Sequence, residues 1–334
     1  MTTGFGLARA DARVFSLFGP EGLLCAAAIV LALALSSPLA ATAAAATAPA
    51  ASSGGASSVS YGTATLNGAV NPRGSDASYY FQYGPTKAYG LQTGILDAGS
   101  GSKGVHVAVA ISGLTPLTQY HYRLVAVGSG GFGYGADKSF HTTKVPLSLG
   151  IFASPNPVLY GGNVTIQGSL SGTDNANRAV VLQVSPFPYT AGFVSVGNPE
   201  LTNSSGGFSF PYLGLIQGAA FRVVTTTNPP VISTIVFESV NLRVSAKAGR
   251  VGPRGRALFY GTVSPAMDKA EIAVMHFTGG KRVFVAGTRL RHRNSSSSRF
   301  SLLAKAKRGG VYQILVHIPG GPLSSTYSPP ILVR

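Results

Sequence analysis

One stretch of this sequence decides the fold, and it reads Gly113-Leu114-Thr115-Pro116-Leu117-Thr118-Gln119-Tyr120-His121-Tyr122-Arg123-Leu124-Val125-Ala126-Val127. From Tyr120 to Val127, side chains alternate with a period of two, which is the pattern of a half-buried strand. The turn-forming residues Gly113 and Pro116 come shortly before it. The stretch therefore predicts a β-strand that follows a tight turn.

Short runs of the same alternation recur along the chain from Tyr61 onward, and no run has convincing helical spacing. Clusters of Gly, Pro, Asn and Ser separate them, as expected for turns. The clearest runs cover residues 64–70, 79–83, 105–111 and 180–184. Strands at such regular spacing are typical of antiparallel sandwiches, so the sequence predicts an all-β fold.

The overall composition favours several domains over one compact enzyme domain. The 334 residues include 43 Gly, 21 Pro, no Trp and one Cys, and only 11% of them are charged. Two or three domains fit this length and composition. A single thiol excludes an intramolecular disulfide and a cysteine-based zinc cluster.

The N-terminus has the order of a secretory signal. Arg9 and Arg13 precede an apolar run at residues 23–35, and small residues follow as far as Ala43. We expect residues 1–43 to be a signal peptide or, as an alternative, an uncleaved membrane anchor, because the apolar stretch is also long enough to span a bilayer. The chain is then secreted or on the cell surface. The Ala/Ser/Gly-rich residues 44–57 predict a flexible linker.

The segment from Leu114 to Tyr120 resembles the strand E to F region of fibronectin type III domains, which carries a Leu-x-Pro-x-Thr-x-Tyr signature. The resemblance covers about residues 58–144 and implies a tyrosine corner, in which the Tyr120 phenol bonds back to upstream backbone. It also implies that Leu114 fills the core beneath Tyr120. The tryptophan that is usual on strand B of this family is absent, and Leu66 is its expected substitute.

Two further modules are expected at residues 145–237 and 238–334, and they look like copies. Residues 164–170 match residues 257–263 in pattern, with Gly168 and Gly261 separated by 93 positions. A Ser-rich turn and the phenylalanine after it recur at nearly the same offset, which indicates duplication. Both modules are similar to immunoglobulin-like repeats of bacterial surface proteins. The predicted architecture is therefore three tandem antiparallel β-sandwiches.

The positive charge is concentrated in the last module. The chain has 26 basic and 10 acidic residues, and residues 238–334 hold sixteen of the basic and three of the acidic ones. Strand alternation predicts that Arg289, Arg291 and Arg293 share one face. Lys305 and Lys307 repeat the alternation further along.

Such a stripe attracts polyanions through its summed potential. The expected partner is an anionic cell-envelope polymer or an acidic polysaccharide. Nucleic acid is not favoured, because stacking aromatics are not interleaved with the basic residues. The membrane is expected to be contacted only through the N-terminal segment. The alternative is that the arginines only make an outer strand soluble.

Tyrosines of the first module give a second candidate site. Tyr79, Phe81 and Tyr83 alternate onto one face and Tyr80 onto the other. Tyr79, Tyr80 and Tyr83 are candidates for stacking on sugar rings. The alternative is that one of these two sets packs the core.

No cofactor, metal or catalytic site is expected. Residues 128–133 match the G-x-G-x-x-G pattern, but a strand follows where a phosphate-binding loop needs a helix, so a glycine-rich hairpin is predicted. The carboxylates and serines show no catalytic spacing. We expect a non-catalytic extracytoplasmic adhesion or spacer protein. Two alternatives stay open: a carbohydrate-binding accessory module of a polysaccharide-degrading system, and a purely structural spacer.

Overall fold

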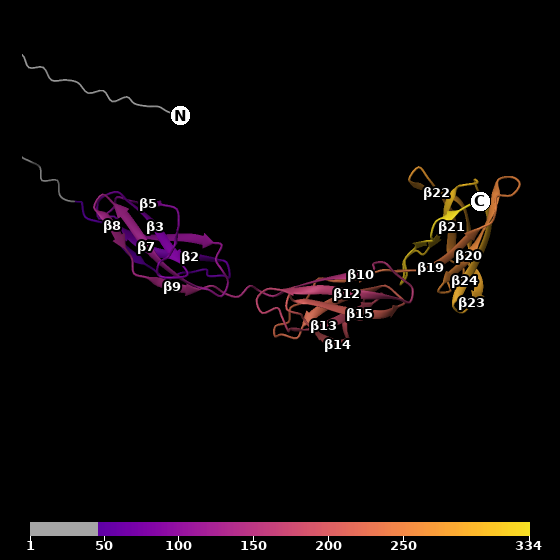
Figure 1. The fold of residues 1–334 in the computed structure, drawn as a ribbon, viewed down its shortest axis with the longest axis horizontal. Coiled ribbons are helices and arrows are strands. Elements are labelled where there is room, and N and C mark those ends of the chain that lie inside the picture. The colour runs from indigo at the N-terminus through magenta and orange to yellow at the C-terminus, as the bar shows by residue number, and fades with distance from the viewer. Residues whose placement is uncertain (1–45) are drawn as a thin grey trace, which may run out of the picture. The chain divides into compact units, whose positions relative to one another are not determined.

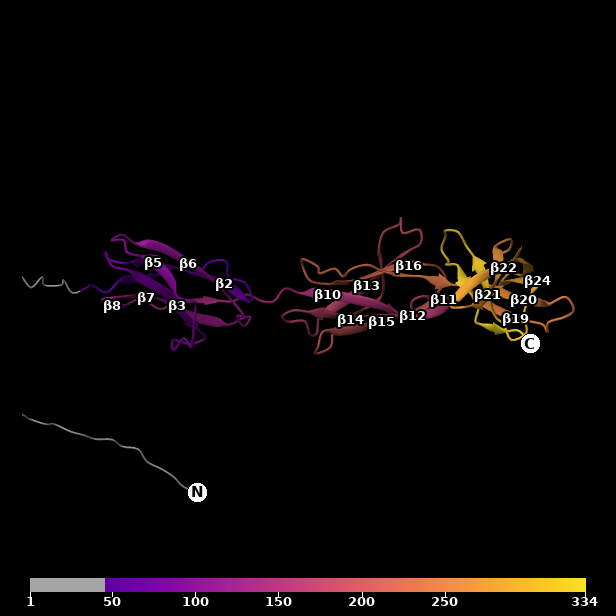
Figure 2. The same ribbon diagram turned by 90° about the horizontal axis from the view of Figure 1, so that it is seen from above.

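The computed structural model describes residues 46–334, and strands are the only regular elements in this range (Figures 1 and 2). They form three two-sheet sandwiches, so the prediction of an all-β fold with three tandem sandwiches is confirmed. Residues 46–334 thus contain no helical segment that could span a bilayer. The predicted signal segment, residues 1–43, lies outside the described residues.

The first sandwich, drawn from indigo to magenta in Figure 1, packs a three-stranded sheet against a six-stranded one. The small sheet has the order β1–β2–β6. The large one has the order β4–β3–β7–β8, with β5 added to β3 and β9 added to β7. The strands are β1 (Ala50–Ser53), β2 (Thr63–Asn71), β3 (Ala77–Gly84), β4 (Leu91–Gln92), β5 (Leu96–Gly99), β6 (Val105–Ser112), β7 (Gln119–Gly128), β8 (Gly131–Tyr134) and β9 (Lys138–His141).

The middle sandwich repeats this strand order with β10–β12–β15 in one sheet and β14–β13–β16–β17 in the other. A short parallel pair, β11 with β18, lies at its end. The predicted domain boundary before residue 238 falls within β17, which pairs with β16 of this sandwich. The strands are β10 (Ser148–Ser154), β11 (Val158–Leu159), β12 (Gly162–Ser171), β13 (Ala179–Pro186), β14 (Val194–Leu201), β15 (Gly207–Leu215), β16 (Ala219–Thr225), β17 (Val236–Glu238) and β18 (Val240–Asn241).

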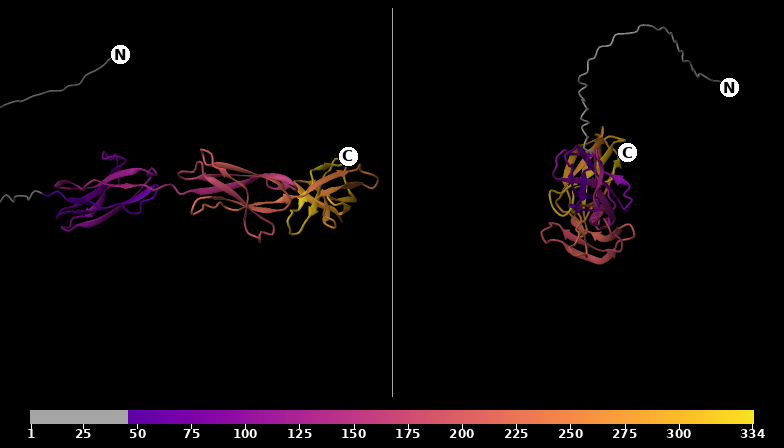
Figure 3. Two further views of the ribbon diagram at one scale, coloured as in Figure 1. Left: turned by 90° about the horizontal axis from the view of Figure 1, so that it is seen from below. Right: turned by 90° about the vertical axis from the view of Figure 1, so that its left-hand side faces the viewer.

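The C-terminal sandwich, orange to yellow in Figure 3, adds one strand to the small sheet. Its two sheets have the orders β19–β20–β24–β23 and β22–β21–β25–β26, and β27 also pairs with β25. The strands are β19 (Arg243–Ala248), β20 (Arg256–Ser264), β21 (Glu271–Thr278), β22 (Lys281–Arg289), β23 (Arg291–Asn294), β24 (Ser297–Lys305), β25 (Val311–His317), β26 (Thr326–Tyr327) and β27 (Ile331–Leu332).

Strands β2, β12 and β20 each carry one glycine at a place where a side chain would not fit against the neighbouring strand. A Cβ added at Gly68, Gly168 or Gly261 would collide with a backbone carbonyl of the preceding strand, and in the last two cases also with a phenylalanine ring, Phe208 or Phe300. The two glycines identified from the sequence repeat thus occupy the same place in two sandwiches. Gly68 is a third copy, which the sequence comparison missed.

A tyrosine ties the turn before a core strand to that strand in two of the sandwiches. The Tyr120 Oη accepts a hydrogen bond of 3.0 Å from the Thr115 amide, and Leu114 is buried beside it. This is the contact that the fibronectin type III resemblance implies. In the C-terminal sandwich the Tyr312 Oη accepts one of 2.9 Å from the Lys307 amide, at the same spacing of five residues. Sequence reasoning did not find this second corner.

We expect Tyr312→Phe to destabilise the C-terminal sandwich by about 1–2 kcal/mol, because the Lys307 amide loses its acceptor. Tyr312 is 2% exposed, so water cannot readily replace the phenol. Hydrogen exchange of the β25 amides in the full chain measures this loss. Tyr61→Phe is the matched control, since Tyr61 is 46% exposed, and an equal effect of both changes would contradict the role of the corner.

The prediction of a flexible linker over residues 44–57 is wrong for residues 50–53, which form β1. These residues pair with β2 from Asn71 back to Gly68. The Ser53 Oγ accepts a hydrogen bond of 3.0 Å from the Leu124 amide, and the Tyr122 Oη donates one of 2.6 Å to the Gly54 carbonyl. Small side chains suit this strand because it lies close to the neighbouring backbone.

The glycine-rich segment after β7 leaves the space that β1 and the residues just before it occupy. A Cβ at Gly130, Gly133 or Gly135 would collide with the backbone of residues 46–53. The segment is a β-hairpin, as the sequence indicated, with Gly128 opposite Gly131. Its glycines therefore serve close packing of the chain against itself.

Candidate polyanion-binding face

The structure divides the predicted arginine stripe between two sheets. Leu290, which is 2% exposed, lies between two strands. Arg289 is the last residue of β22, and Arg291 is the first residue of β23. These strands belong to opposite sheets of the C-terminal sandwich. The prediction that Arg289, Arg291 and Arg293 share one face of one strand is therefore wrong. Arg293 lies at an irregularity in the pairing of β23 with β24.

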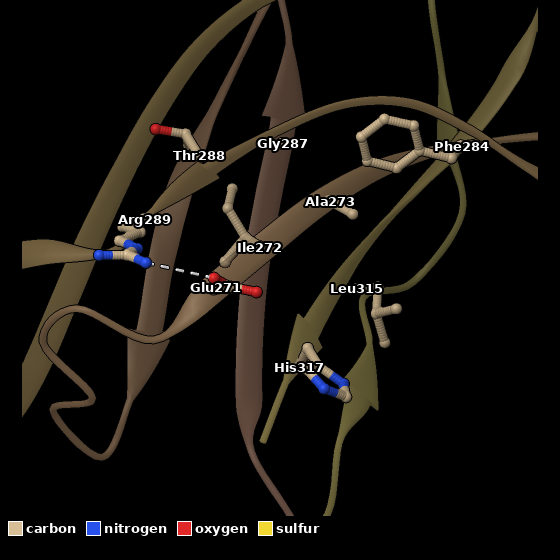
Figure 4. A pocket seen from close by; sticks show the side chains of 9 residues that line it. All are labelled: Glu271, Ile272, Ala273, Phe284, Gly287, Thr288, Arg289, Leu315 and His317. Carbon is tan, nitrogen blue, oxygen red and sulfur yellow. Dashed lines mark hydrogen bonds and ion pairs between the residues drawn. The ribbon is translucent and has the colours of Figure 1, made fainter. Parts of the chain in front are cut away.

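Arg289 belongs to a groove on the outer side of the β22–β21–β25 sheet. Its guanidinium lies 3.4 Å from the Glu271 carboxylate, and Figure 4 shows His317 on the far side of that carboxylate. The groove has a volume of about 520 Å³, with Phe284 toward its other end. Because Arg289 has an acidic neighbour, it adds little to a field that attracts anions.

The two predicted lysines separate as well. Lys305 is the last residue of β24 and its side chain is exposed. Lys307 follows the strand, and its amide is held by Tyr312 in the turn. Of the five predicted residues, only Arg291 and Lys305 lie on the outer face of one sheet.

That sheet, β19–β20–β24–β23, carries seven basic residues and no acidic residue on its four strands. Burial alternates along β20 and β24, which places the even-numbered residues of β20 and the odd-numbered residues of β24 outside. Five exposed cations share this outer surface, which we call the cationic face. They are Lys247, Arg256, Arg291, Arg299 and Lys305.

Four of the five cations stand opposite one another in like-charged pairs. Arg291 pairs with Arg299 across β23 and β24, and Arg256 pairs with Lys305 across β20 and β24. Directly opposite residues lie about 5 Å apart, and like charges at this spacing destabilise a sheet. Among the described residues, none of the five cations makes an ion pair with a carboxylate. An anion bound over these pairs would therefore relieve the repulsion between the cations.

The carboxylates near this sandwich are engaged elsewhere. Glu271 faces Arg289 in the groove. Asp268 accepts hydrogen bonds from Ser298 and His292, which lower the pKa of its carboxyl group. Glu238 is buried in the middle sandwich. Arg243, at the edge of the same sheet, donates a hydrogen bond of 2.8 Å from its guanidinium to the Tyr160 carbonyl. It is therefore not counted in the cationic face.

Sequence reasoning missed Lys247 and Arg299 and did not place Arg256 with them. The signal was the alternation within residues 243–248 and 297–305, where every charged residue has an odd number and so lies on the same side of its strand. The pairing of separate strands depends on register, which a charge run inside one segment does not reveal.

The tyrosines proposed for sugar stacking do not form one exposed platform. Tyr79 is 8% exposed and lies in the core of the first sandwich, and Tyr83 packs against that core. Tyr80 alone is on the outer face, opposite Val125. The core alternative thus describes Tyr79 and Tyr83.

An arginine on the outer face is stacked on aromatic rings in each sandwich. The Arg123 guanidinium lies 4.9 Å from the Tyr89 ring centroid and 4.5 Å from that of Tyr134, and its Nε donates to Gln82 at 2.8 Å. The same combination of arginine, glutamine and aromatic ring recurs as Arg222 with Gln183 and Phe193, and as Arg282 with Gln313 and Tyr327. Its presence in all three sandwiches indicates a structural role.

Residues 46–334 contain no group of three or more His, Cys, Asp or Glu side chains placed to hold a metal ion.

No protein family matches the sequence of this chain, and no curated protein matches it either. Among solved structures, the chain is similar to chicken CNTN1 FN1-FN3 domains, with 16% identity over 85% of this chain and 97% of that one and a TM-score of 0.27. It is also similar to a tetra-tandem repeat in the extending region of a large adhesion protein (10% identity, 85% and 73% covered, TM-score 0.28) and to a set of domains from titin (14%, 85% and 97%, 0.35). These neighbours are fibronectin type III and immunoglobulin-like tandem domains. With TM-scores this low they add no weight to the fold assignment, which rests on the strand order.

Proposed function

We propose that this chain of three tandem β-sandwiches is a non-catalytic extracytoplasmic adhesion protein whose C-terminal sandwich binds an anionic polymer. The observation that carries the proposal is the pair of like-charged cross-strand contacts, Arg291 with Arg299 and Arg256 with Lys305, on a sheet without carboxylates. A surface that served solubility alone would mix both signs of charge.

The binding mechanism is electrostatic. Each like-charged pair is repulsive in the free chain, and an anionic group placed over the pair neutralises both cations at once. The first two sandwiches hold a much smaller excess, because residues 51–144 contain six basic and three acidic residues and residues 145–237 contain two of each. We assign them the role of a structured spacer in the chain.

The salt dependence of binding tests this proposal in the full chain. We expect the chain to bind sodium polyuronate and sodium polyphosphate at 20 mM salt, and its affinity for both to fall at least tenfold at 300 mM salt, where the Debye length drops to about 6 Å. Absence of binding at 20 mM, or affinity that does not change with salt, would contradict the proposal. The full chain is the right material, because β17 and β18, at residues 236–241, belong to the middle sandwich.

A further inference from the structure

An exposed apolar strip separates the two cationic pairs on the cationic face. It consists of Leu258, Tyr260 and Leu303, which are 44%, 42% and 52% exposed. Leu258 is directly opposite Leu303, and Tyr260 is opposite Ser301, one step further along the same two strands. The three side chains are therefore adjacent on one surface.

The neighbours of the strip leave it open. Lys247 is the cross-strand partner of Tyr260 on β19, so a cation borders the ring. Beside Leu258 lies Gly249, whose amide donates a hydrogen bond of 2.8 Å to the Leu258 carbonyl and which has no side chain to cover it. A ligand can thus reach the apolar strip and a positive charge at the same time.

The distance between the cationic pairs fixes the size of the ligand. Arg299 and Lys305 lie six residues apart on β24, which corresponds to about 20 Å along an extended strand. A ligand that neutralises both pairs must therefore span about 20 Å and must cross Leu258, Tyr260 and Leu303. Its middle part needs a surface that can replace water over apolar side chains.

This arrangement selects among anionic polymers. A polyphosphate chain is charged and hydrated throughout, so it would strip water from the apolar strip without gaining contacts there. The rings of an acidic polysaccharide present C–H faces that pack on a tyrosine ring and on leucine methyl groups, while their carboxylates project from the edges. We propose that the cationic face binds an acidic polysaccharide along β20 and β24, with carboxylates at the two cationic pairs and sugar rings over Leu258, Tyr260 and Leu303.

This inference rests on the proposed function, and its test isolates the contribution of the apolar strip. In the full chain, Tyr260→Thr combined with Leu303→Thr keeps every charge and the strand propensity of both positions. We expect the affinity for polyuronate to fall about tenfold and the affinity for polyphosphate to change less than twofold. Phe284→Thr is the matched control, because Phe284 is 63% exposed on the opposite sheet. It should leave both affinities unchanged.

Two results would overturn the inference. One is an equal loss for polyuronate and polyphosphate in the double variant, and the other is no loss for either. Vesicles with anionic lipid provide a further arm, and binding to them as tight as binding to polyuronate would also contradict a polysaccharide site. None of these outcomes contradicts the proposed function, which fails if the chain does not bind at low salt or if its binding does not depend on salt.

Discussion

Reversing one cation in each pair, with Arg299→Glu and Lys305→Glu together, should lower the affinity of the full chain for polyuronate at least 100-fold at low salt. That factor equals about 2.7 kcal/mol. Each new carboxylate removes a cation from the cationic face and also neutralises the partner across the strands, Arg291 or Arg256. Both pairs therefore lose their attraction for anions.

The same variant should unfold at a temperature no lower than that of the unmodified chain. Each like-charged contact becomes an opposite-charged one, and opposite charges at cross-strand positions stabilise a sheet by a few tenths of a kcal/mol. Binding and stability thus change in opposite directions, as is common where stability is given up for function. A loss of binding that accompanies a large fall in the unfolding temperature would contradict this explanation.

A control with the same change in net charge separates position from total charge. Lys269→Glu and Lys281→Glu lie in the same sandwich but outside the cationic face, in the turn before β21 and at the start of β22. We expect this variant to lose less than fivefold in affinity. If both double variants weaken binding equally, attraction depends on net charge alone and the cationic face has no special role.

Glu238 should make the stability of the middle sandwich depend on pH. Its side chain is 1% exposed, and neither carboxylate oxygen has a hydrogen-bond partner among the described residues. Burial raises the pKa of this carboxyl group from 4.5 to about 7, and the Val158 amide, which donates its hydrogen bond to the Ser239 carbonyl at 3.0 Å, opposes this rise only in part. Unpartnered burial of this kind disfavours the charged form.

The direction of the effect follows from the two pKa values. Below pH 4.5 the Glu238 carboxyl is protonated in both the folded and the unfolded chain, so it adds no pH dependence. Between pH 4.5 and about 7 only the unfolded chain ionises, and the stability of the folded chain falls as pH rises. Above pH 7 the loss reaches about 3 kcal/mol.

Glu238→Gln removes this titration and keeps the shape of the side chain. At pH 8 we expect the variant to be more stable than the unmodified chain by about 2–3 kcal/mol, and at pH 4 the two should be nearly equal. Hydrogen exchange of the β16 and β17 amides, compared between the two chains at each pH, measures the difference. The β7 amides of the first sandwich serve as the internal reference. A constant difference at both pH values would contradict the raised pKa.

Features carried by neighbouring residues could be predicted from the sequence. The turn from Leu114 to Tyr120 is local, so its signature identified the tyrosine contact before the partner strand was known. Val236, Glu238 and Val240 also alternate, which places Glu238 on the same side as two apolar residues. That signal for a buried carboxylate was present in the sequence and was not used.

Features that depend on how distant strands meet could not be predicted. Residues 289–293 have the alternation of one strand, but the chain passes from one sheet to the other at the buried Leu290. The cationic face arises from the register of β20, β23 and β24, which are separated by long stretches of sequence. Similarly, β1 has little hydrophobic pattern of its own and forms because glycines such as Gly133 leave room for it.

Protection of individual lysines by a bound polymer tests the central claim most directly. The full chain would be acetylated at low salt with and without polyuronate, and the extent of modification would be measured for each lysine. We predict that polyuronate protects Lys247 and Lys305, on the cationic face, and leaves Lys103 and Lys281 as reactive as in the free chain. Equal protection of all four lysines, or protection of Lys281 without Lys305, would contradict binding at the cationic face.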